Sequence, residues 1–111
     1  MKYCILFLLL ISTALAQTMG RAGHLNVTVM PDASGVTGEL AWTASTTPNV
    51  QYRVYRSTSS GSGNVLIADN LSQLTWTDRK LRAKITYVWT VTAFNAAGES
   101  PHSNAVTATI P

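Results

Sequence analysis

The longest alternating stretch of the 111-residue chain is ITYVWTVTAF, at residues 85–94. Tyr87, Trp89, Val91 and Ala93 fall on one phase of this stretch, and the intervening residues fall on the other. A period of two in β-branched and aromatic residues is typical of a β-strand with one buried face. No stretch of useful length has the period of a helix, so the sequence predicts an all-β fold.

Six further short stretches have strand-like alternation. They are residues 24–30, 38–43, 51–56, 65–68, 74–77 and 105–110. Turn and loop residues separate them at 31–35, 45–49, 57–64 and 95–100. Seven strands at regular spacing predict a two-sheet β-sandwich. The residues expected to face its core are Trp42, Tyr52, Val54, Trp76, Trp89 and Val91.

The first 16 residues predict a signal peptide. Lys2 gives a basic start, residues 4–11 are apolar, and Ala14-Leu15-Ala16 supplies the small residues that signal peptidase requires. The alternative is a membrane anchor, but the apolar run is shorter than the roughly 20 residues that span a bilayer. We therefore expect a secreted chain in which residues 17–24 form a short lead and residues 25–111 form one domain.

The composition of the predicted mature chain limits its chemistry. The only cysteine, Cys4, leaves with the signal peptide, so we expect a monomer without a disulfide. Seven basic residues against five acidic ones give a net charge of +2, which is too small to indicate nucleic-acid binding. Four of the bases lie within residues 79–84, where a solvated turn is favoured over an anion-binding patch. No membrane insertion is expected after signal cleavage.

Four motifs occur together along the chain. They are LAWT at 40–43, YRVYR at 52–56, Leu81 six residues before Tyr87, and YVWTVTAFNAAGES at 87–100 followed by Ser103-Asn104. As a set they resemble fibronectin type III domains, particularly those of secreted bacterial proteins. The resemblance implies a seven-stranded immunoglobulin-like sandwich. It also adds Leu81 and Tyr87 to the core, through a corner in which the tyrosine hydroxyl reaches backbone near the leucine.

Two residues depart from the pattern of that family. Ala83-Lys84 stands where the family usually has Pro-Gly, which predicts a looser turn. Trp89 is larger than the aliphatic residue that is common at its position, so it needs small neighbours in the core.

The chain offers little for catalysis, metal binding or cofactor binding. Its histidines, His24 and His102, form no pair at metal-ligand spacing, and the acids include no Asp-rich calcium loop. Each histidine is expected to be an exposed residue at a strand end, with a catalytic or metal role as the alternative. The Ser/Gly-rich segment 57–64 lacks the Lys-Ser/Thr pair of a phosphate-binding loop. We therefore expect no enzyme activity, no metal and no cofactor.

The outward phases predict a candidate binding face made of Arg53, Tyr55, Thr90 and Phe94. The family resemblance implies that the two strands carrying these residues are neighbours in one sheet. Exposed aromatic rings beside an arginine suit protein or sugar surfaces. The alternative is that single exposed aromatic residues are ordinary on a sandwich.

Two functions follow from these observations. The first is a secreted, non-catalytic interaction or spacer module that contacts an extracellular protein or a glycan. The alternative, implied by the resemblance, is an accessory carbohydrate-binding module of an extracellular polysaccharide-degrading system. Asn26 and Asn70 lie in glycosylation acceptor triplets, which matter only in a eukaryotic source.

Overall fold

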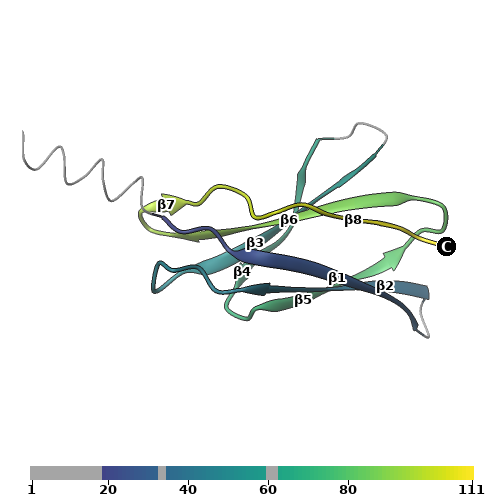
Figure 1. Cartoon of the computed structure of the whole chain (residues 1–111), viewed down its shortest axis with the longest axis horizontal. Coiled ribbons are helices and arrows are strands. Elements are labelled where there is room, and N and C mark those ends of the chain that lie inside the picture. Colours follow the sequence, from purple (N-terminus) through teal and green to yellow (C-terminus); the bar gives the residue numbers. More distant parts are fainter. Residues whose placement is uncertain (1–18, 33–34, 60–62) are drawn as a thin grey trace, which may run out of the picture.

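Two antiparallel sheets pack face to face in the computed structural model, which describes residues 19–32, 35–59 and 63–111 (Figure 1). The first sheet contains β1 (Gly23–Asp32), β2 (Gly35–Thr43) and β5 (Thr75–Leu81), in the order β1-β2-β5. The second contains β4 (Val65–Leu71), β3 (Gln51–Thr58), β6 (Thr86–Asn95) and β7 (Gly98–Glu99) in that order, with β8 (Val106–Thr109) also paired to β6. The predicted all-β sandwich is confirmed, with the two-residue β7 as an additional strand.

Several predicted boundaries are wrong because cross-strand pairing extends the strands. β3 continues to Thr58, which pairs with Tyr87, so the predicted loop at 57–64 begins too early. β5 runs to Leu81, beyond the predicted end at residue 77. β7 pairs with the end of β6 inside the predicted turn at 95–100. Ser, Asp and Gly favour turns locally, and here a neighbouring strand overrides that preference.

The N-terminal lead is bonded to the folded unit from Gly20 onward. The Gly20 amide donates a hydrogen bond to Thr47 Oγ1 at 2.8 Å, and the Ser45 hydroxyl donates to the Gly20 carbonyl at 2.6 Å. Ala22 is fully buried. The predicted signal peptide, with Cys4, and residues 60–62 of the predicted loop lie outside the described residues. Within the described ranges, no helix is long and apolar enough to cross a membrane.

The core lies between the sheets. Of the predicted core residues, the structure buries Trp42, Tyr52, Val54, Leu81, Tyr87, Trp89 and Val91. Trp76 is half-buried and packs against this cluster. A Cβ at Gly38, in the facing sheet, would lie 3.5 Å from Trp89 Cζ2 and 3.3 Å from Leu81 Cδ1. Gly38 is therefore a small neighbour that makes room for the large Trp89 ring.

Polar side chains of the segment between β7 and β8 complete the hydrogen bonding of the sandwich. Asn104 accepts a bond from the Leu25 amide and donates one to the Leu25 carbonyl, both at 2.9 Å. The Ser100 and Ser103 hydroxyls accept bonds from β6 amides, at 2.9 Å and 3.0 Å. The two serines thus replace strand carbonyls along β6, and Asn104 joins β1 of one sheet to the C-terminal segment of the other.

Candidate functional site

The predicted binding face lies on the outer surface of the second sheet. β3 and β6 pair side by side, with Tyr55 opposite Thr90 and Gln51 opposite Phe94. Arg53, Tyr55 and Phe94 are each partly exposed, but Thr90 is only 8% exposed and therefore offers little surface. The prediction placed Thr90 on the correct side of its strand. It missed that the segment after β7 covers this part of the sheet.

Arg53 forms the centre of the exposed part of the face. Its Cζ lies 3.9 Å from the centroid of the Phe94 ring, which is the geometry of a cation–π contact. Its Nε is 3.0 Å from Asp69 Oδ1 and its Nη1 is 3.2 Å from Glu99 Oε1. The hydrogen bond between Arg53 and Asp69 raises the pKa of the guanidinium and lowers the pKa of the carboxyl. Two carboxylates thus hold Arg53 over the ring.

Glu99 connects Arg53 to the second aromatic residue of the face. Its Oε2 accepts hydrogen bonds from the Tyr55 hydroxyl at 2.5 Å and the Thr92 hydroxyl at 2.6 Å. Burial alone would raise the pKa of Glu99, but the bonds from Thr92 and Tyr55 and the charge of Arg53 outweigh it and lower that pKa. Burial and the bond to Glu99 raise the pKa of the Tyr55 hydroxyl. The carboxylate form of Glu99 therefore holds this face together.

His102 closes the other side of the face. Its ring centroid lies 4.8 Å from that of Tyr55, and its Nδ1 is 2.7 Å from Thr90 Oγ1. The side chain is exposed, as the sequence predicted, but it has specific partners. Sequence reasoning missed Glu99 and His102 as members of this face because both lie outside the predicted strands. The signal available was their position directly after the longest strand.

A second group of polar residues lies inside the sandwich. Asp78 of β5 is 4% exposed and accepts hydrogen bonds from Arg56 Nη1 at 2.8 and 2.9 Å. Its Oδ2 also accepts a bond from Trp89 Nε1 at 2.8 Å. The carboxylate therefore joins the first sheet to β3 and β6 of the second. A buried charge with three such bonds is satisfied, and its role here is structural. Asp78 lies one residue beyond the predicted end of this strand at residue 77.

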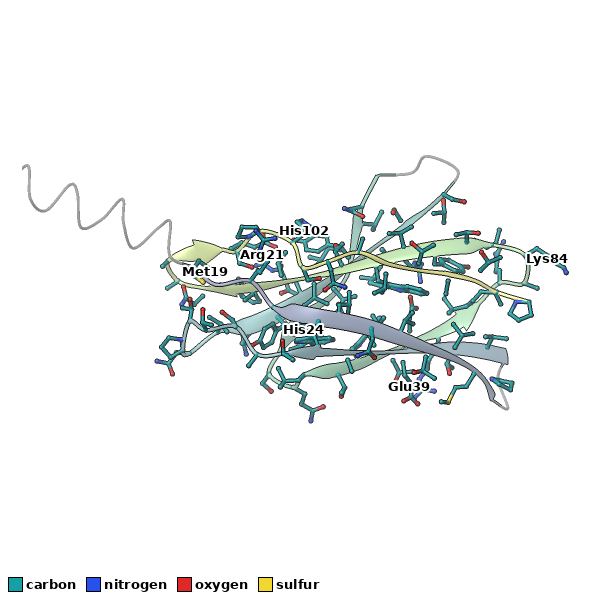
Figure 2. The ribbon with its side chains drawn as sticks, in the orientation of Figure 1. Met19, Arg21, His24, Glu39, Lys84 and His102 are labelled. Atoms are coloured by element: carbon teal, nitrogen blue, oxygen red, sulfur yellow. The ribbon has the colours of Figure 1, made fainter. Side chains whose placement is uncertain are left out.

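The described residues contain no group of three or more His, Cys, Asp or Glu side chains that could hold a metal ion. The two histidines lie on different parts of the fold. His24 is in β1 of the first sheet, whereas His102 follows β7 of the second. Figure 2 shows both side chains, together with Arg21, in the half of the molecule where the N-terminal end of β1 lies.

Solved structures with the same fold include an Fn3-like protein from Clostridium thermocellum. It is 29% identical and matches with a TM-score of 0.69 over 85% of this chain and 95% of that protein. The chain has the fold of a fibronectin type III domain. A myokine structure, at 20% identity and a TM-score of 0.60, shares the fold over 78% of this chain and 94% of that one. A titin fragment with the kinase and its flanking domains shares it at 18% identity and a TM-score of 0.68, over 82% of this chain and 17% of that one.

A curated protein also resembles this chain in sequence. It is an amylopullulanase from Thermoanaerobacter thermohydrosulfuricus, 39% identical over 71 residues. Those residues are 63% of this chain but only 5% of that protein, so the likeness carries no evidence of catalysis. No family model matches the sequence.

The corner of this fibronectin type III domain has the form that the resemblance implied. The Tyr87 hydroxyl accepts a hydrogen bond from the Arg82 amide at 3.0 Å, one residue after Leu81. Lys84, in the position of the usual glycine, has a left-handed φ of 68°. Its amide donates to the Ile110 carbonyl at 2.8 Å. The departure from Pro-Gly therefore leaves a hydrogen-bonded turn that contains backbone strain.

Proposed function

We propose that this fibronectin type III domain is a secreted, non-catalytic contact module, and that it binds its partner through the outer face of the second sheet. The observation that carries the proposal is the fixed arrangement of Arg53, Tyr55 and Phe94. Each of these side chains is partly exposed and each is held by neighbours on the same face. Aromatic and arginine side chains are the residues that contribute most to protein interfaces.

The rigidity of the face supports binding. A flexible arginine loses rotamer entropy when a partner immobilises it, at a cost of roughly 0.5 to 1.5 kcal/mol. Arg53 is already held by Asp69, Glu99 and the Phe94 ring, so most of that cost falls on folding. An arginine and two rings that are ordered before binding can form an interface with a smaller entropic loss.

The proposal is tested by NMR titration of the ¹⁵N-labelled domain against the protein encoded by the neighbouring reading frame. We expect amide shifts that concentrate on β3, β6 and β7. Phe94→Leu, which keeps an apolar side chain but removes the ring under Arg53, should weaken binding. Thr28→Ala changes an exposed position of β1 in the other sheet, so it is the control and should leave binding unchanged. Shifts confined to the first sheet would contradict the proposed face, and no binding would favour a spacer role.

The second candidate function is an accessory carbohydrate-binding module. The observation that favours it is the 39% identity to part of an amylopullulanase. Sugar rings stack on aromatic faces, and Tyr55 and Phe94 are the aromatic residues predicted for this face. Arg53 covers the Phe94 ring, so a sugar that stacks there has to displace the guanidinium. The same titration with pullulan and amylose separates the two functions. Shifts on β3 and β6 that disappear in Tyr55→Ala would support sugar binding. No shift up to the solubility limit of each polysaccharide would exclude these two glucans as ligands.

A further inference from the structure

We propose that a groove at the N-terminal end of β1 is a binding site for a small carboxylate ligand, independent of the face on the second sheet. The groove is open and about 680 Å³ in volume. It is lined by residues 21–25 of the N-terminal segment and by Ser103 and Asn104. This volume lies within the range of roughly 300 to 1,000 Å³ that is usual for small-molecule sites.

The floor of the groove is rigid and uncharged. Asn104 uses its amide oxygen and nitrogen on the Leu25 backbone, with both bonds at 2.9 Å. The Ser103 hydroxyl accepts a hydrogen bond from the Val91 amide and donates one to the Asn104 carbonyl. These polar groups are therefore engaged within the protein. Recognition of a ligand falls to the two side chains at the rim, Arg21 and His24.

Arg21 is presented to the groove by anchored neighbours. Gly20 is hydrogen-bonded to Ser45 and Thr47, and Ala22 is fully buried, while Arg21 between them is exposed. Three of the described acidic side chains, Asp69, Asp78 and Glu99, are already paired with Arg53 or Arg56.

Glu39 is exposed in β2, opposite Thr28 of β1. Figure 2 shows Glu39 in the other half of the molecule from Arg21. Among the described side chains, therefore, Arg21 has no carboxylate to neutralise it. A guanidinium binds a carboxylate through two parallel, charge-assisted hydrogen bonds, which are stronger than its hydrogen bonds to a neutral ligand group.

His24 supplies a second nitrogen donor at the rim. It lies at an irregularity in the pairing of β1 with β2, between Gly23 and Asn26, and its φ of 51° is in the left-handed region. Irregularities of this kind redirect a side chain out of the regular alternation of a strand. The His24 side chain is exposed, and an imidazole can donate one hydrogen bond through either ring nitrogen. Arg21 and His24 together provide two or three donors and no acceptor charge, which favours a carboxylate.

The carboxylate could belong to a sugar acid or to an acidic amino acid, and the test separates these sources. The ¹⁵N-labelled domain is titrated with sodium glucuronate, N-acetylglutamate and glucose, each to about 50 mM, because contacts to exposed groups are weak and a dissociation constant of about 10 mM needs ligand at such concentrations. We expect the two carboxylates to shift the amides of residues 21–25 and 103–104, and glucose to leave them unchanged. The carboxylate that binds more tightly shows whether the ligand is a sugar acid or an acidic amino acid. Equal shifts with glucose, or carboxylate shifts elsewhere only, would overturn the proposal.

Three variants make the test specific to the groove. Arg21→Gln should weaken carboxylate binding about five- to tenfold through loss of the charged hydrogen bonds. Arg82→Gln removes the same charge from the exposed turn after β5, beside Lys84 at the opposite end of the molecule, and should change binding less than twofold. His24→Gly removes the imidazole at a position where glycine is unstrained, so it should weaken binding without lowering the melting temperature. Equal weakening by the two arginine variants would show a nonspecific charge effect and refute the site.

Discussion

Replacing Trp89 with phenylalanine tests the buried Asp78 cluster. The indole Nε1 donates a hydrogen bond to Asp78 Oδ2 at 2.8 Å, and both residues are buried. Trp89→Phe removes this donor from a charged acceptor, at a cost of about 1.5 to 3 kcal/mol. It also leaves part of the space beside Gly38 unfilled, which costs roughly a further 1 to 2 kcal/mol. We therefore expect Trp89→Phe to lower the free energy of unfolding by about 2.5 to 5 kcal/mol.

Trp42→Phe is the matched control, because Trp42 is also buried in the same core. Its Nε1 has no hydrogen-bond partner among the described residues. The packing loss is again roughly 1 to 2 kcal/mol, but the change also removes an unpaired buried donor, which returns about 1 to 3 kcal/mol. The free energy of unfolding should therefore lie between about 1 kcal/mol below and about 2 kcal/mol above that of the wild type. The two variants differ in the partner of the indole, not in the size of the truncation.

Urea unfolding followed by far-UV circular dichroism measures both variants, since the change in this signal on unfolding comes mainly from the backbone of the strands. The slope of the free energy with urea should be unchanged if both remain two-state. If Trp89→Phe and Trp42→Phe lowered the free energy of unfolding by amounts that agree to within about 0.5 kcal/mol, the role of the Asp78 hydrogen bond would be refuted. Differences of that size are usual even between independent sites. In an Asp78→Asn background, Trp89→Phe should cost less than in the wild type, since the charged acceptor is already absent.

Three further changes test other parts of the structure. Lys84→Gly should raise the urea midpoint and the free energy of unfolding by about 1 kcal/mol, because glycine adopts the observed left-handed φ without strain; a lower midpoint would contradict the strain. Asn104→Ala should lower the free energy of unfolding by about 2 to 3 kcal/mol, because both its hydrogen bonds to the Leu25 backbone are lost; a loss below about 0.5 kcal/mol would show that water replaces them. Glu99 has a lowered pKa in the folded state, so the unfolded chain binds more protons than the folded one. The stability that Glu99 contributes is therefore complete above its ordinary pKa of 4.5, and it is lost as the pH falls through the lower pKa of the folded state. Glu99→Gln should therefore flatten the loss of melting temperature between pH 5 and pH 3, roughly, and an unchanged slope would argue against the carboxylate as the centre of the face.

The sequence predicted the sandwich because its strands carry a strong period of two. The alternation of β3 and β6 also determines which of their residues face the core, since a shift of the pairing by one residue would reverse the two faces. The ends of the strands could not be predicted in the same way. Thr58, Asp78 and Glu99 lie in segments whose local composition favours turns, and they are strand residues because a neighbouring strand offers hydrogen bonds.

The candidate binding face was predicted only in part. Alternation identified Arg53, Tyr55 and Phe94 as outward-facing, and the structure places them on one surface. Thr90 is also outward-facing but is covered, because the chain after β7 turns back and brings His102 over it. Glu99 and Asp69, which hold the arginine, come from separate strands on either side of β3 and β6. A local sequence pattern cannot predict such contacts between residues far apart in the chain.

By itself, then, the sequence determined the fold class and the inward and outward phases of the strands, and its resemblance to a family implied the corner at Leu81 and Tyr87. These properties depend on residues a few positions apart, so a short window contains the information. Only the tertiary structure decided which polar side chains meet. The pairing of Arg56 with Asp78, the meeting of Arg53 with Glu99, and the groove between Arg21 and Asn104 each join residues far apart in the chain, and only the packing of the two sheets brings them together.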